Sequence, residues 1–238
     1  MRIIAGAYKG RRLATPRGAT TRPTADQVRI ALLDTLMPWL PEARVLDLFA
    51  GAGGVGLEAL SRGAARATFV ERDARAVQAL RVNVTSLGVE RAARVLRDDV
   101  RRALETLRHE GARFDVVFLD PPYDGEAVAT TLEALGGAEL LAGGAVVVAQ
   151  HLTKRAPAAS VGALTAFRTR RFGETTLTFF RRGATDQRPA AADEHRAADE
   201  HPPVADAHRR AADEQHAAQQ RRAADEHRAA AHERRAGG

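Results

Sequence analysis

The chain has 238 residues, no cysteine and a formal net charge of +6 at pH 7. The lack of cysteine excludes disulfides, thiolate metal sites and thiol nucleophiles, and we expect no metal site. The longest apolar run, residues 145–149, is too short to span a bilayer, and the first ten residues lack the apolar core of a signal peptide. We therefore expect a cytoplasmic protein that does not bind a membrane.

The first 40 residues predict a small basic extension that consists of a β-hairpin and a helix. RIIAG and RRLAT can pair around residues 8–10, and Thr24 with Gln27 forms the pattern of a capping box at the start of the helix. The first 29 residues contain seven basic side chains and one acid, Asp26. A solvated basic surface would explain this excess, but a clamp for nucleic acid is the favoured interpretation. The basic residues are Arg2, Lys9, Arg11, Arg12, Arg17, Arg22 and Arg29.

Residues 44–149 alternate between short apolar runs and amphipathic segments. This alternation predicts βαβ units, a parallel sheet and right-handed crossovers. Two further β-rich runs, residues 165–172 and 174–181, flank Gly173 and predict an antiparallel hairpin. The predicted fold class is therefore α/β, with a Rossmann-like, mostly parallel seven-stranded sheet that ends in an antiparallel hairpin. The predicted parallel strands are residues 44–49, 67–71, 94–97, 114–119 and 144–149, and the predicted helices are residues 55–61, 73–87, 100–109 and 126–135.

Acidic residues follow the ends of four successive predicted strands. They are Asp47, Glu71, Asp99 and Asp120. Because the carboxyl ends of parallel strands meet at one edge of a sheet, and ligands of such sheets bind beyond that edge, we expect these four acids to surround a ligand. Asp99 also suits the N-cap position of the next helix, and this second interpretation stays open.

A glycine turn follows the first parallel strand. Residues 51–56, GAGGVG, match the G-x-G-x-x-G pattern, and Glu71 lies 18 positions after Gly53, where a ribose-binding acid belongs. A nicotinamide dehydrogenase is therefore one candidate. However, Asp47 stands at the same turn and would repel a pyrophosphate, whereas a ligand with an ammonium group would be attracted. S-adenosylmethionine is such a ligand, and it is the cofactor that we predict.

The fourth strand ends abruptly in FLDPPYDG. Two prolines remove two backbone donors and fix the backbone, so this segment ends a strand whatever else it does. It also predicts a rigid shelf of catalytic residues that holds a planar NH2 group: Asp120, Pro121, Pro122 and Tyr123. The ring of Tyr123 would stack on an extruded base.

The composition changes near residue 183. Residues 184–238 contain 9 Arg, 11 Asp or Glu and 6 of the 8 His, and few large apolar side chains, which predicts a low-complexity, disordered tail. The other residues carry 27 Lys or Arg against 19 Asp or Glu, so the predicted folded part is basic and favours nucleic acid as its partner. We predict three parts: residues 1–40, residues 41–183 and residues 184–238.

Several motifs together resemble one family. VLDLFAGAGGVGLEALSRGA, FVERD, LRVNV and FLDPPYD, with the opening MRIIAGAYKGRRLATPRG and TRPTADQVRIALLDTL, are similar to the RsmD-type ribosomal RNA guanine-N2 methyltransferases. The resemblance covers residues 1–182. It implies a class I S-adenosylmethionine-dependent methyltransferase domain at residues 41–183, in which Ala52 stands where relatives usually have serine.

The resemblance also implies roles for individual residues. Asp47 and the amides of Gly51 and Gly53 would hold the methionine end of the cofactor, and Glu71 would accept the ribose hydroxyls. Asp99 would take the adenine amino group, with Asp98 as the less favoured partner, and for Asn83 a role in the core or in capping is favoured. The residues expected to bind RNA phosphates are Arg2, Lys9, Arg11, Arg12, Arg22 and Thr24.

The implied reaction is methylation of a guanine N2 in 16S ribosomal RNA, at guanine 966. The implied partner is the small ribosomal subunit or its assembly intermediate, bound by a monomer. Two alternatives stay open. The shelf suits any planar amine, so the substrate could be a DNA adenine or a protein glutamine. A non-catalytic RNA-binding assembly factor with a vestigial cofactor site is the other alternative.

Overall fold

The computed structural model describes residues 1–16, 23–122, 126–137 and 139–182, without the side chains of residues 23–25. The predicted tail, Arg17, Arg22 and Tyr123 lie outside the described residues, as does the side chain of Thr24. Within these ranges, no helix has both the length and the apolar character needed to cross a membrane.

The described residues form one mixed sheet of eight strands in the order β3-β2-β1-β4-β5-β8-β7-β6. Strands β1 to β5 pair in parallel, and β5, β8, β7 and β6 pair antiparallel. The predicted count of seven strands is wrong by one, because residues 160–161 add a two-residue edge strand that leaves no pattern in the sequence. The strands are β1 (Arg44–Leu48), β2 (Arg66–Val70), β3 (Ala93–Leu96), β4 (Phe114–Leu119), β5 (Leu141–Leu152), β6 (Ser160–Val161), β7 (Leu164–Phe172) and β8 (Thr175–Arg182).

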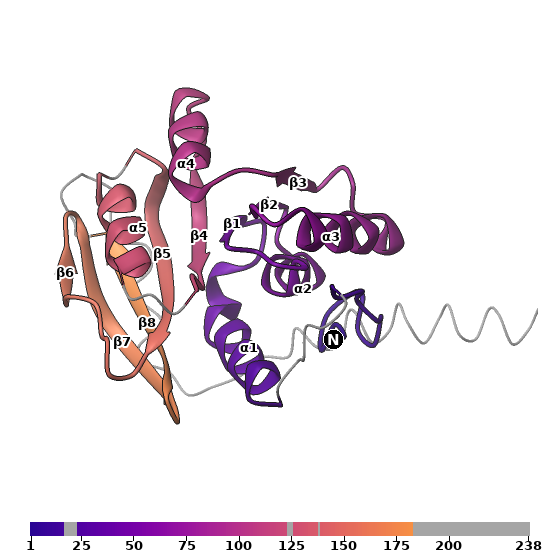
Figure 1. The fold of residues 1–238 in the computed structure, drawn as a ribbon, viewed down its shortest axis with the longest axis horizontal. Helices are drawn as coiled ribbons and strands as arrows, with labels where there is room; N and C mark the ends of the chain where they lie inside the picture. Colours follow the sequence, from indigo (N-terminus) through magenta and orange to yellow (C-terminus); the bar gives the residue numbers. More distant parts are fainter. Residues whose placement is uncertain (17–22, 123–125, 138, 183–238) are drawn as a thin grey trace, which may run out of the picture. The chain divides into compact units, whose positions relative to one another are not determined.

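Helices cover both faces of this sheet (Figure 1). Alternate residues of β4 point to opposite faces, so Val116 and Phe118 pack with α1, α2 and α3, whereas Val117 and Leu119 pack with α4 and α5. The predicted α/β architecture with parallel βαβ units is confirmed. The helices are α1 (Pro23–Leu36), the short 3₁₀ helix η1 (Met37–Trp39), α2 (Gly54–Ser61), α3 (Ala74–Leu87), α4 (Val100–His109) and α5 (Glu126–Gly136).

The strand order reverses between β1 and β4. From β1 the chain proceeds outward through β2 to β3, then returns to place β4 on the other side of β1. The helices that follow β1 and β4 therefore lie on opposite faces, and the carboxyl ends of these two strands border an open crevice between them. Asp47 of β1 and Asp120 directly after β4 come to this reversal point.

The N-terminal segment folds against α2. Its two arms pair through one antiparallel bridge, Arg2 with Arg12, together with hydrogen bonds such as that from the Ile3 amide to the Arg11 carbonyl at 2.9 Å. The predicted pairing is confirmed, although it is shorter than a regular hairpin. The predicted cap at Thr24 is wrong, because α1 begins at Pro23, one residue earlier.

Candidate functional site

An acidic hollow of about 210 Å³ lies at the carboxyl ends of β1 to β4. Three of the four predicted strand-end acids line it, and Asp98 is a fourth carboxylate. Arg72 is the one basic residue of the lining, so the acids outnumber the bases by four to one. Its lining residues are Phe49, Glu71, Arg72, Asp98, Asp99, Val100, Asp120 and Pro122.

Glu71 is held in a fixed position by two backbone amides. Its Oε2 accepts a hydrogen bond from the Gly51 amide, and its Oε1 accepts one from the Asp73 amide, both at 2.8 Å. Each carboxylate oxygen has a second lone pair that can accept another donor. Glu71 can therefore accept two hydroxyls of a ligand without losing its contacts to the glycine turn.

The glycine turn needs glycine because both Gly51 and Gly53 have positive φ, and because side chains pack closely on Gly53. Gly53 has φ +85°, and a Cβ there would stand 2.3 Å from Cδ1 of Leu80. Gly51 has φ +56° and open space where a Cβ would be. Phe49, at the mouth of the turn, has φ 62°, a strained conformation for a residue other than glycine. The turn therefore requires left-handed backbone conformations, and of these three residues Phe49 lines the hollow.

Both predicted amides of this turn already have partners within the protein. The Gly51 amide donates to Glu71, and the Gly53 amide donates to the Ala50 carbonyl at 2.8 Å. A ligand could accept a hydrogen bond from either amide only by sharing the hydrogen with the acceptor that the amide already has. The amides fix the position of Glu71 and the shape of the turn, which is a role that the sequence did not reveal.

Asp47 lies beneath the turn and outside the lining of the hollow. Its side chain is 2% exposed, and its Oδ2 accepts a hydrogen bond from the Gly56 amide at 2.9 Å. Burial, together with the charges of Asp120 and Glu71, raises the pKa of Asp47 to about 7, although the Gly56 hydrogen bond lowers it. The charges of Asp120 and Glu71 thus disfavour the ionised form of Asp47, and a cation bound nearby would reduce this repulsion.

Asp120 lies where β4 ends and the two prolines begin. It is half-buried, and this burial raises the pKa of its carboxyl to about 7. Pro121 is buried, whereas Pro122 is exposed and lines the hollow next to Asp120. Asp120 and Pro122 thus line the same hollow as Glu71, whereas Pro121 is not among its lining residues and Tyr123 lies outside the described residues.

Both adjacent acids after β3 line the hollow. Asp99 is the N-cap of α4, and its Oδ1 accepts a hydrogen bond from the Arg101 amide at 3.0 Å. Oδ1 of Asp98 accepts one from the Asp99 amide at 2.8 Å. The N-cap role of Asp99 is confirmed, and it leaves the second carboxylate oxygen without a partner among the described residues. The adenine contact of Asp99 therefore stays a prediction, and Asp98 stays a candidate for it.

Two buried side chains join the N-terminal segment to this site. Asn83 is 1% exposed, and its Nδ2 donates to the carbonyls of Ala14 and Ala52 at 3.0 and 2.9 Å. Glu58, also 1% exposed, accepts hydrogen bonds from the amides of Ile4 and Ala5 at 2.8 and 2.9 Å. The core role predicted for Asn83 is confirmed, whereas Glu58 was missed, and its only sequence signal is an acid within an otherwise apolar helix.

The described basic residues of the N-terminal extension divide into two groups. Arg2, Lys9 and Arg12 are exposed, and Arg11 is exposed but donates a hydrogen bond to the Ser86 carbonyl. Arg29 is 6% exposed and donates to the Arg2 carbonyl and to Asp26. The interpretation of Arg29 as part of a basic surface is therefore wrong, because its guanidinium is buried under the N-terminal segment.

Comparison with known proteins identifies the family. The family model described as "Conserved hypothetical protein 95" matches residues 1–181. The chain belongs to this family. It is 36% identical over 182 residues to "Putative rRNA methyltransferase YlbH" of Bacillus subtilis (strain 168), covering 76% of this chain and 99% of that protein. The predicted resemblance to the RsmD-type enzymes is confirmed.

Two further relatives belong to Escherichia coli. "Ribosomal RNA small subunit methyltransferase D" of strain K12 is 42% identical over 123 residues, a stretch that spans 52% of this chain and 60% of that protein. The solved structure "Putative methyltransferase yhhF from Escherichia coli." is 34% identical with a TM-score of 0.68, covering 77% of this chain and 98% of that chain. The predicted Rossmann-like methyltransferase fold is confirmed.

Proposed function

We propose that this protein uses S-adenosylmethionine to methylate the exocyclic N2 of a guanine in small-subunit ribosomal RNA. The observation that carries the proposal is the acidic hollow, in which Asp120 and Pro122 of the shelf line the same space as Glu71 and Asp99. The printed names of the relatives support ribosomal RNA as the substrate. The choice of guanine N2, and of position 966, is our prediction.

The charge of the hollow fits this cofactor. Four carboxylates against one guanidinium attract a sulfonium and an ammonium group, and the same acids would repel the pyrophosphate of a dinucleotide. Glu71 would accept the ribose hydroxyls, and Asp99 or Asp98 would accept the adenine amino group. Asp47, beneath Gly51 and Gly53, would attract the ammonium of the methionine end through its charge. When bound, the cofactor supplies a methyl group on a positively charged sulfur.

The shelf would direct an amine at that methyl group. The lone pair of guanine N2 is delocalised into the ring, so the nitrogen must be oriented before it can attack. Asp120 and the main-chain carbonyl of Pro121 would each accept one N–H, and the prolines would keep both acceptors fixed. Orientation of this kind supplies roughly 7–11 kcal/mol of a barrier. Asp120, with a pKa of about 7, would then take the proton that the methylated nitrogen loses.

A methyl-transfer assay with nucleoside analysis tests the proposal. Protein and radiolabelled S-adenosylmethionine are incubated with small-subunit RNA, duplex DNA or a glutamine peptide, and the product is digested and chromatographed. We expect label in N2-methylguanosine from the RNA. Label in adenine or in the peptide would assign the site to another planar amine, and cofactor binding without any transfer would favour the non-catalytic alternative.

The form of the substrate is a separate prediction. A monomer that methylates an assembly intermediate should transfer methyl groups faster to a small-subunit particle than to naked 16S RNA. Parallel assays with both acceptors, on protein whose mass in solution is measured by light scattering, check this point. Equal rates would indicate that free RNA is sufficient.

A further inference from the structure

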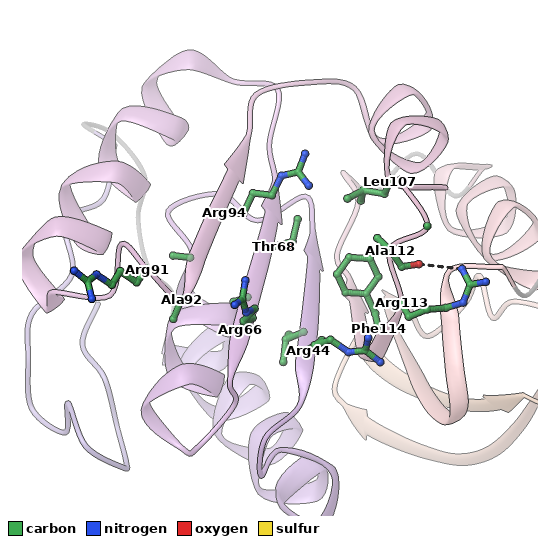
Figure 2. Close-up of a pocket in the computed structure, with 14 residues that line it drawn as sticks. Arg44, Arg66, Thr68, Arg91, Ala92, Arg94, Leu107, Ala112, Arg113 and Phe114 are labelled. Carbon is green, nitrogen blue, oxygen red and sulfur yellow. Dashed lines mark hydrogen bonds between the residues drawn. The ribbon is translucent and has the colours of Figure 1, made fainter. Parts of the chain in front are cut away.

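A second hollow lies at the opposite edge of the sheet, at the amino ends of the parallel strands (Figure 2). It has a volume of about 320 Å³, and the buried side chains of Phe114 and Leu107 line it. We call it the arginine hollow, because five arginines surround it. They are Arg44 of β1, Arg66 of β2, Arg94 of β3, Arg91 before β3 and Arg113 before β4.

The sheet itself brings like charges together in this hollow. Arg44 and Arg66 are register partners on β1 and β2, and Thr68 is the register partner of Arg94 on β2 and β3. Residues two apart on one strand share a face, so all three arginines stand on the same face of the sheet. Neighbouring strands are about 4.8 Å apart, and like charges on facing residues destabilise a sheet. An anion in the hollow would remove this repulsion.

Carboxylates compensate only part of the charge. Arg44 pairs with Asp115 at 3.1 Å, and Arg94 pairs with Glu110 at 2.5 Å. In the described part of the chain, Arg66, Arg91 and Arg113 have no acidic partner, and Arg113 donates one hydrogen bond to the Ala112 carbonyl at 3.2 Å. Three exposed guanidiniums therefore carry charge that no described carboxylate compensates. In Figure 2, Arg91 and Arg113 lie at opposite ends of the hollow with Arg66 between them, so they suit successive groups of an extended ligand.

Phosphate is the ligand that this arrangement suits. A guanidinium presents paired N–H donors that match two oxygens of a phosphate, and several guanidiniums around one hollow match consecutive phosphates of a nucleic-acid backbone. The five residues of β1 span about 17 Å at 3.3 Å per residue, so the two edges of the sheet are that far apart. A folded RNA that reaches the acidic hollow can therefore extend around the domain to this edge.

We propose that the arginine hollow is a second RNA contact, which holds backbone phosphates of the substrate at the edge opposite to methyl transfer. This inference rests on the proposed RNA substrate. It goes beyond that proposal because the predicted RNA-binding residues all belong to the first 24 residues, whereas the hollow belongs to the methyltransferase fold. The N-terminal segment and the hollow would bind different parts of one RNA.

Two variants, each of which loses three positive charges, test the proposed RNA contact. The hollow variant carries Arg66→Gln, Arg91→Gln and Arg113→Gln, and the control variant carries Arg75→Gln, Arg81→Gln and Arg168→Gln. The three control arginines are exposed on α3 and β7, away from the hollow. Fluorescence anisotropy measures binding of a 16S RNA fragment that the wild-type protein methylates, over a series of salt concentrations.

We expect the hollow variant to lose at least about tenfold in RNA affinity, and its plot of log affinity against log salt to become shallower by about two. The control variant should lose less than about threefold. Thermal stabilisation by S-adenosylmethionine should be unchanged in both. A short hairpin that reaches only the acidic hollow should bind the wild type and the hollow variant equally.

Equal losses in the two variants would overturn the inference while leaving the proposed function intact, since the wild type still methylates RNA. Failure of the wild type to methylate any RNA would instead contradict the proposed function. ATP and pyrophosphate are tested separately by thermal shift. One outcome is that ATP or pyrophosphate stabilises the wild type but not the hollow variant, while the hollow and control variants bind RNA with the same affinity. That result would assign the hollow to a small phosphate ligand and refute the RNA contact.

Discussion

At the scale of single residues, Asp120 is expected to act as a hydrogen-bond and proton acceptor. Replacing it with Asn keeps the size of the side chain but removes its ability to take a proton. We expect the single-turnover rate of methyl transfer to fall roughly 10²–10⁴-fold. Affinity for S-adenosylmethionine, measured by calorimetry, should change little. A variant that retains full turnover would show that Asp120 only ends the strand.

The same residue predicts the pH dependence of the reaction. The pKa of Asp120 is raised to about 7 by burial, so the acceptor form is lost as pH falls through 7. The wild-type rate at saturating cofactor should therefore rise between pH 6 and pH 8. Asp47 titrates in the same range and interacts with Asp120, so cofactor affinity is measured at each pH to separate binding from turnover.

The raised pKa of Asp47 also predicts how the free energy of unfolding changes with pH. A carboxyl whose pKa rises from 3.8 to about 7 on folding destabilises the folded protein as pH increases from about 4 to 7. Asp47→Asn retains an acceptor for the Gly56 amide and carries no charge. We expect it to unfold at higher urea concentration, with an advantage that grows between pH 5 and pH 8 by roughly 1–3 kcal/mol. An advantage independent of pH would contradict this explanation.

At the scale of elements, Glu58 of α2 holds the N-terminal segment in place. Its two oxygens accept the Ile4 and Ala5 amides, and Oε1 also accepts a hydrogen bond from Nε of Arg62 at 3.1 Å. Glu58→Ala leaves these buried donors without partners, so we expect a loss of roughly 3–5 kcal/mol in the free energy of unfolding. Hydrogen exchange at residues 4 and 5 should accelerate.

Asp34 provides the matched control for Glu58. It pairs with the same Arg62 at 2.6 Å, but its side chain is 58% exposed. The Arg62 side chain is 4% exposed and keeps its bond to Glu58 when Asp34 is removed, so Asp34→Ala should leave the exchange of residues 4 and 5 unchanged. Similar effects of the two substitutions would mean that Arg62, and not the carboxylate of Glu58, positions the segment.

The elements also show what the sequence could predict. Strands β2, β3 and β4 each have an acid within three residues of their end, and this local pattern predicted three of the acids that line the hollow. The contacts of Asn83 with Ala14 and of Glu58 with Ile4 join residues far apart in the chain, so no local pattern reveals them. Arg29 resembled its exposed basic neighbours in sequence, and only the fold shows its burial. The arginine hollow arises from strand register, which likewise requires the sheet.

At the scale of the whole molecule, we expect residues 184–238 to be dispensable for folding and cofactor binding. The family match ends at residue 181, and the composition of the later residues supplies too little apolar surface for a core. A chain that ends at residue 183 should unfold at the same temperature as the full chain, with the same stabilisation by S-adenosylmethionine, as measured by calorimetry. Since the residues after 183 carry 9 Arg and 11 Asp or Glu, their removal changes the net charge only from +6 to +8. RNA affinity of the shortened chain should therefore stay the same or increase slightly, and a large loss would assign the tail to the RNA interface.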